Sequence, residues 1–94
     1  MTLKPPDDLE APQAEVFGIL AHLAARSAAL RGVRLIPLDN LLLARVAQLV
    51  VLARQRAAAG KLADAVVFAD LSQELAAQFW LTVPASLLPA IGRA

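Results

Sequence analysis

The chain has 94 residues, which is enough for one domain and too few for a second hydrophobic core. It contains 21 alanines and 18 leucines, only one histidine, and neither cysteine nor tyrosine. Alanine and leucine favour helices, and the lack of cysteine excludes disulfides and thiolate metal sites. The composition therefore predicts a single all-α domain, and it leaves catalysis without most of its usual side chains.

The hydrophobic share of 59% raises the question of a membrane segment. The longest uncharged run, Leu75–Gly92, is 18 residues long and is interrupted by two prolines. A transmembrane helix needs about 20 mostly apolar residues, so we expect none. The segment Met1–Asp8 holds two prolines and two aspartates, unlike a signal peptide. We expect a cytoplasmic protein. Seven arginines against two lysines, with so much alanine, are typical of a GC-rich bacterial or phage source.

The net charge of +1 conceals an uneven distribution. Residues 1–25 carry one basic and four acidic side chains, and residues 62–94 carry one basic and three acidic ones. Residues 26–61 between them carry seven basic side chains and one acidic one. The middle of the chain is therefore basic, and both flanks are acidic.

The first predicted helix spans residues 9–31, after a flexible N-terminus over 1–8. Asp7 or Asp8 would cap its start, and Gly32 would close its end in the left-handed conformation. Its large apolar side chains gather on about a third of the circumference, which we expect to face the core. This face comprises Val16, Ile19, Leu20, Leu23 and Leu30, together with the small polar Ser27. A second stripe holds only small residues, Gly18, Ala21, Ala25, Ala28 and Ala29, and is either a site of close helix approach or plain surface.

The second predicted helix spans residues 38–59 and is closed by Gly60. It is apolar almost all round, with a narrow polar strip of Arg45, Gln48, Gln55 and Arg56. Two companion helices cannot cover all of such a surface, so the pattern predicts a further partner. Arg54 projects on the side opposite this strip, where it snorkels, pairs with a carboxylate or lies in an interface.

The third predicted helix spans residues 62–80, with an apolar stripe of Ala65, Phe68, Leu71, Leu75 and Phe79. An apolar tail, 81–94, follows and contains Pro84 and Pro89, which prevent a smooth extension of the helix. We expect the tail to turn back onto its own chain or to cross to a neighbour. The predicted fold is a compact antiparallel three-helix bundle with an apolar, proline-containing C-terminal tail.

No residue pattern in the sequence indicates a catalytic or metal-binding site. His22 has Gly18 and Arg26 as helical neighbours, which are not metal ligands, and the serines lack a nucleophile elbow. Carboxylate pairs such as Asp70 with Glu74 are typical of an exposed helix face. We therefore predict no enzyme activity, no metal or other cofactor and no small-molecule substrate.

The sequence favours a non-enzymatic protein–protein interaction module that self-associates, as a homodimer, and acts on another protein as adaptor, chaperone, inhibitor or assembly subunit. The residues that we assign to the interface are Leu41, Leu42, Arg45, Val46, Gln48, Leu52, Phe79, Trp80, Leu87 and Leu88. Tryptophan and arginine are enriched among the residues that dominate interface energies, although Trp80 is equally suited to closing the core.

The alternative is a small nucleic-acid-binding regulator. The basic middle of the chain would supply the phosphate contacts, through Arg26, Arg31, Arg34 and Arg45. In a helix-turn-helix arrangement the third helix would be the recognition helix. Its acidic side chains would be repelled by the DNA phosphates, which counts against this alternative.

Overall fold

The computed structural model describes residues 3–32, 34 and 37–90, with residues 37 and 38 described by their backbone only. Three helices make up the fold: α1 (Ala11–Arg31), α2 (Pro37–Ala58) and α3 (Leu62–Ala77). The described part of the chain holds no strand. The prediction of an all-α fold with three helices is confirmed.

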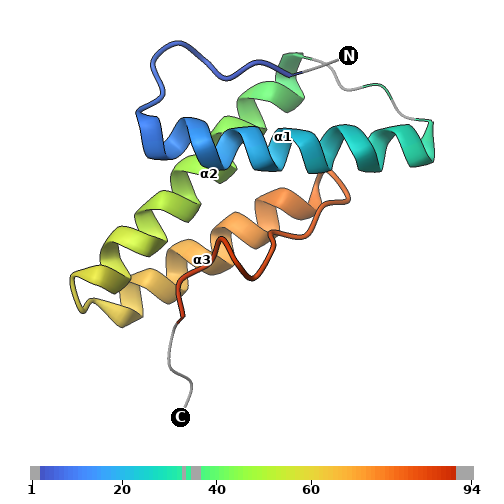
Figure 1. The fold of residues 1–94 in the computed structure, drawn as a ribbon. Coiled ribbons are helices and arrows are strands. Elements are labelled where there is room, and N and C mark those ends of the chain that lie inside the picture. The colour runs from blue at the N-terminus through green and yellow to red at the C-terminus, as the bar shows by residue number, and fades with distance from the viewer. Residues whose placement is uncertain (1–2, 33, 35–36, 91–94) are drawn as a thin grey trace.

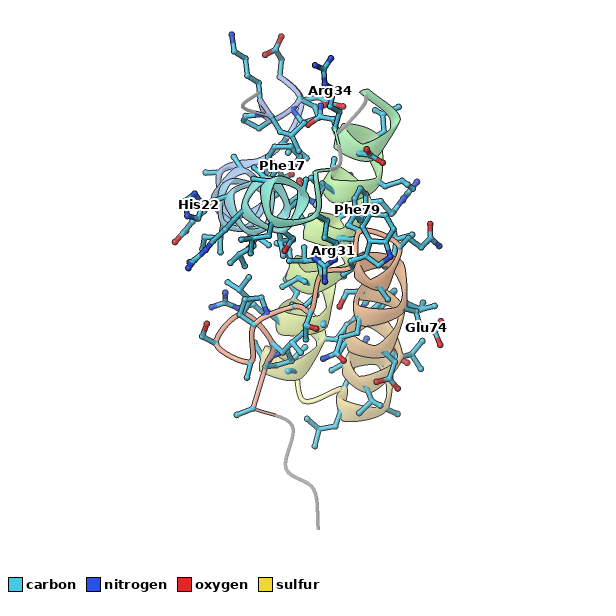
Figure 2. The ribbon with its side chains drawn as sticks, turned by 90° about the vertical axis from the view of Figure 1, so that its right-hand side faces the viewer. Phe17, His22, Arg31, Arg34, Glu74 and Phe79 are labelled. Atoms are coloured by element: carbon cyan, nitrogen blue, oxygen red, sulfur yellow. The ribbon has the colours of Figure 1, made fainter. Side chains whose placement is uncertain are left out.

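The second helix lies at the centre of the fold, because α2 packs against both α1 and α3. Figure 1 shows α2 and α3 as an antiparallel hairpin, with α1 lying across it. The segment after α3 returns over the same face of the hairpin that α1 covers, as Figures 1 and 2 show. One face of the hairpin is therefore covered by α1 and the tail.

The first helix is capped by a residue later than the predicted Asp7 or Asp8. Its N-cap is Glu10, whose backbone N–H donates to Oε1 of Gln13, three residues on, at 3.2 Å. This contact belongs to a capping box, in which the side chain at the third helical position satisfies a donor that the helix leaves open. Proline at the second helical position costs nothing there, because its missing N–H has no partner within the first turn.

Two glycines close the first two helices, as the sequence predicts. Gly32 caps α1 with φ +68°, and Gly60 follows α2 with φ +79°. At the second site the N–H of Lys61 donates to the carbonyl of Arg56 at 2.9 Å, and the N–H of Gly60 donates to that of Ala57 at 3.0 Å. These two bonds define a Schellman turn, which reverses the chain into α3.

The third helix ends at Ala77, earlier than the predicted residue 80, and a second Schellman turn closes it. The N–H of Leu81 donates to the carbonyl of Ala76 at 3.3 Å, and that of Trp80 donates to Ala77 at 2.9 Å. Trp80 occupies the left-handed position with φ +53°, as the one non-glycine residue with positive φ in the described chain. This turn directs the tail back over the hairpin.

Phe17 is fully buried in the core, although the apolar stripe predicted for the first helix does not include it. Ala21, Ala24 and Ala28 are buried with it, whereas Ile19 is 40% exposed and Leu30 is 81% exposed. The predicted core face of α1 was thus wrong at Ile19 and Leu30. Part of the small-residue stripe is the packed side, because alanines let α1 cross close to the hairpin.

The third helix packs through small side chains as well. Its buried residues are Ala65, Ala69, Ser72 and Ala76, which we call the small-residue seam. The Ser72 hydroxyl donates to the carbonyl of Ala69 at 2.7 Å, so its burial leaves no donor unpaired. Because the seam faces inward, Val67 and Leu71 point outward, with 55% and 44% of their surface exposed. The predicted placement of Leu71 on the core side was therefore wrong.

The C-terminal tail docks on its own chain. Leu81, Val83 and Leu87 are buried in the main core cluster, and Leu88 packs partly against it. A short turn, with the N–H of Leu87 donating to the carbonyl of Pro84 at 2.9 Å, places these side chains on one side. The tail therefore supplies core volume between α1 and the hairpin.

The small-residue seam predicts a sharp contrast between adjacent alanines. Ala76 is fully buried and Ala77 is exposed. Ala76→Leu should lower the free energy of unfolding by about 1–3 kcal/mol through overpacking, whereas Ala77→Leu should change it by less than about 0.5 kcal/mol. Urea denaturation measures both, and equal stabilities would show that α3 does not approach α2 through this seam.

The left-handed Trp80 predicts that glycine is better tolerated there than alanine. Trp80→Gly and Trp80→Ala both remove the indole, so the difference between their free energies of unfolding reports the cost of the left-handed backbone conformation alone. The glycine variant should be more stable by about 1 kcal/mol in urea denaturation. Gly60→Ala, at the equivalent turn, should lose a similar amount. If the two Trp80 variants match, the turn does not hold this conformation in solution.

Candidate interaction surfaces

The face of the hairpin opposite α1 and the tail is not covered by any other described element. On α2 it carries Leu41, Arg45, Gln48 and Leu52, which recur at intervals of four, three and four residues and so lie on one side of the helix. Leu41 is 62% exposed, and Nη1 of Arg45 donates to Oε1 of Gln48 at 3.3 Å. Four of the ten predicted interface residues are thus collected in one stripe.

The third helix extends this surface. Val67 and Leu71 are exposed on it, and a shallow groove of about 230 Å³ separates it from α2. The groove is lined by Leu49, Leu71, Glu74, Leu75 and Gln78. We call the whole surface the open face: Leu41, Arg45, Gln48, Leu49 and Leu52 of α2 with Val67, Leu71, Glu74, Leu75 and Gln78 of α3. It joins large aliphatic side chains from two helices into one patch.

The other predicted interface residues lie elsewhere. Val46, Phe79 and Leu87 are buried in the core, and Leu42 and Leu88 are partly buried against it. Sequence reasoning missed Leu71 because it assigned this residue to the core stripe of the third helix, and it gave no place to Leu49 or Val67. The signal was present in Ala65, Ala69, Ser72 and Ala76, whose helical spacing marks the packed side of α3.

The end of the molecule where α1 and α3 both terminate carries a separate surface. Trp80 is 59% exposed, and the guanidinium carbon of Arg31 lies 5.8 Å from the centroid of its ring, within cation–π range. Leu30, next to Arg31, is 81% exposed. We call these three residues the Trp80 end. Figure 2 shows Arg31 beneath the end of α1 on the side of α3, near Phe79.

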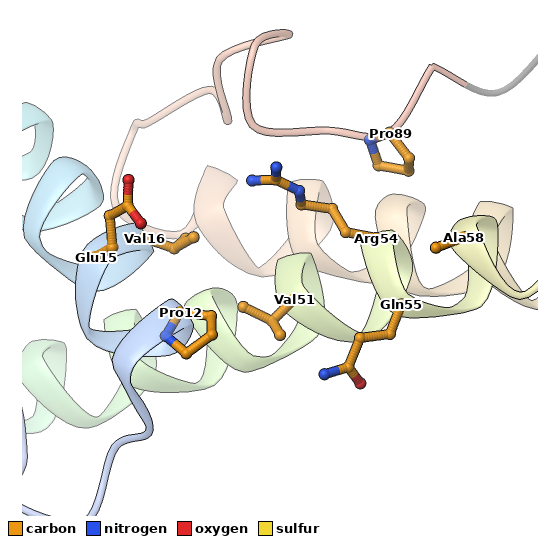
Figure 3. Close-up of a pocket in the computed structure, with 8 residues that line it drawn as sticks. All are labelled: Pro12, Glu15, Val16, Val51, Arg54, Gln55, Ala58 and Pro89. Atoms are coloured by element: carbon orange, nitrogen blue, oxygen red, sulfur yellow. The ribbon is translucent and has the colours of Figure 1, made fainter.

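A larger groove of about 510 Å³ lies at the opposite end of α1, and we call it the α1 groove. Its lining residues are Pro12, Glu15, Val16, Val51, Arg54, Gln55, Ala58 and Pro89 (Figure 3). Arg54 comes four residues after Val50 and seven after Ala47, which are both fully buried, so it rises from the core-facing side of α2. Neither the Glu15 side chain nor the Arg54 side chain has a hydrogen-bond or ion-pair partner among the described residues.

The four arginines of the nucleic-acid alternative do not share one face. Arg26 and Arg31 are five residues apart on α1 and therefore about 140° apart around it. Arg31 stacks on Trp80, and Arg45 lies on the open face. Figure 2 places Arg34 at the top of the molecule, away from Arg31. The fold thus distributes the basic segment over several directions.

Within the described ranges, no three or more His, Cys, Asp or Glu side chains come together as a metal site. None of the described helices is both long and apolar enough to span a bilayer. Comparison of the chain with protein-family models, with curated proteins and with solved structures finds no match.

The dispersal of the arginines predicts weak binding to duplex DNA without sequence preference. Replacing Arg31 and Arg34 by Ala should leave this binding little changed, because the two side chains do not act together. Fluorescence anisotropy across a salt series measures it. Submicromolar binding at physiological salt that is lost in the double variant would favour the nucleic-acid alternative, with a salt slope of about −0.9 per phosphate contact.

Proposed function

We propose that this chain is a non-enzymatic association module that forms a homodimer through its open face. The observation that carries the proposal is the exposure of leucines on two adjacent helices of one face, Leu41 at 62% and Leu71 at 44%. As a dimer the module would serve another protein as adaptor, chaperone, inhibitor or assembly subunit. The composition supports a bacterial or phage source and a cytoplasmic location for it.

The chemistry of the open face suits a symmetric contact. A twofold interface brings the same patch of each copy together, so the patch has to complement itself. Arg45 and Glu74 give the open face both signs of charge, and the groove beside Leu71 offers a recess to an exposed side chain such as Leu41. A stable interface buries about 800 Å² per partner, its buried centre is more apolar than the rest of the surface, and arginine is enriched there.

Replacing exposed leucines of the open face by charged residues should dissociate the dimer. Leu41→Asp combined with Leu71→Asp should weaken self-association about 100-fold or more, because two leucines lose their burial and two charges would be desolvated. Size exclusion with light scattering over a concentration series measures the effect. Circular dichroism should show unchanged helix content, since both side chains are exposed in the single chain.

Leu62→Asp is the matched control. Leu62 is 47% exposed, close to the value for Leu71, but lies nine residues earlier on α3 and therefore on the opposite side of the helix. This variant should dimerise like the wild type. A wild-type chain that stays monomeric at high concentration, or a Leu62 variant that dissociates as fully as the double variant, would contradict the proposal.

A further inference from the structure

The presence of tryptophan at position 80 needs an explanation beyond the turn it forms. The Schellman turn after α2 has glycine in the same left-handed position, with φ +79°, and glycine adopts this conformation without steric cost. At Trp80 the indole is 59% exposed, so burial in the core does not compensate for the strain. Strained residues of this kind are common at functional sites. The indole side chain, and not the backbone turn, therefore accounts for tryptophan at this position.

The side chains around Trp80 orient it for a contact. The Arg31 guanidinium lies 5.8 Å from the ring centroid and restricts the indole, which lowers the entropy lost when a partner binds. Leu30 adds an aliphatic side chain that is 81% exposed. The Trp80 end therefore presents an aromatic ring beside a positive charge, with an exposed leucine at the same end of α1, and its partner has to supply an apolar recess with an acidic group.

The α1 groove supplies both. Its volume of about 510 Å³ accommodates an indole, and Val16, Val51 and two prolines give it an apolar lining. Figure 3 shows Glu15 and Arg54 rising on two sides of this groove. The side chains of Asp7, Asp8 and Glu10, which precede α1, are exposed and add negative charge at this end of the helix.

We propose that the Trp80 end of one copy docks into the α1 groove of a second copy. The indole lies on the apolar lining and its N–H donates to Glu15 or Gln55, the acceptors at the rim. Arg54 stacks on the face of the incoming ring, as Arg31 does within the chain. Arg31 of the incoming copy pairs with Glu15, so that the Glu15 carboxylate, which has no partner among the described residues of the single chain, becomes paired.

This contact joins two different surfaces, so it is head-to-tail and does not use the open face. A head-to-tail contact that does not close into a ring produces an open chain of copies. Combined with dimers formed through the open face, it would produce a larger assembly. The inference goes beyond the proposed function and does not rest on it, because the groove and the Trp80 end act without the dimer.

The test separates the two contacts by working in a chain that carries Leu41→Asp and Leu71→Asp. In that background, Trp80→Gly removes the indole and suits the left-handed turn. Glu15→Lys with Arg54→Glu inverts the groove charges and conserves the net charge. Each variant alone should associate about ten-fold more weakly or worse than the background chain, as expected for loss of a central contact.

Mixing the two variants should restore association, because the groove of the first and the Trp80 end of the second are both intact. Analytical ultracentrifugation should then detect a one-to-one complex and nothing larger. Asp70→Lys, on an exposed site of α3, is the control and should not impair association. Circular dichroism checks that every variant keeps its helix content.

The unaltered chain gives an independent readout, because Trp80 is its single tryptophan. Tryptophan emission should shift to shorter wavelength as protein concentration rises, and high salt should move this transition to higher protein concentration by screening the ion pair. A background chain that stays monomeric, a mixture that does not associate, or emission that is independent of concentration would each overturn the head-to-tail contact. None of these outcomes depends on whether the open face dimerises.

Discussion

The close approach of α3 to α2 through small side chains determines much of this structure. Ala65, Ala69, Ser72 and Ala76 line the inward side of α3, and small side chains allow two helix axes to lie near each other. A seam of this kind fixes the rotation of the helix, because turning α3 would push Val67 or Leu71 against α2. The same constraint that packs the hairpin therefore sends its larger aliphatic side chains to the outside.

A hairpin packed through alanines buries little apolar area of its own, so the fold depends on what covers its other face. Large side chains arrive there from three directions: Phe17 from α1, Val50 from α2 and Leu87 from the tail. Apolar burial contributes about 25 cal/mol per Å², so each of these buried side chains stabilises the fold. The Schellman turn at Trp80 is what brings the tail to this position, so a strained residue supports the core indirectly.

The sequence predicts the helices better than their faces. Composition, the two glycines and the apolar periodicity identify α1, α2 and α3 to within a few residues. The packed side of α1 was missed because Ile19 and Leu30 are large, although a crossing helix needs alanines at the contact. Trp80 was missed as a left-handed residue because glycine is the usual signal. Helical spacing identifies which residues share a side, but not which side a neighbouring element covers.

The fold separates the arginines of the basic central segment, so they do not form a single positive patch. A segment with seven basic residues would create a strong field if all of them faced one way, and such fields attract polyanions. Here Arg31 lies on an indole, Arg45 beside Gln48 and Arg54 above an apolar groove. Each of these cations borders apolar side chains on a different surface. In the contacts proposed above, such cations would contribute to orientation and specificity, while leucine and tryptophan side chains would supply the strength.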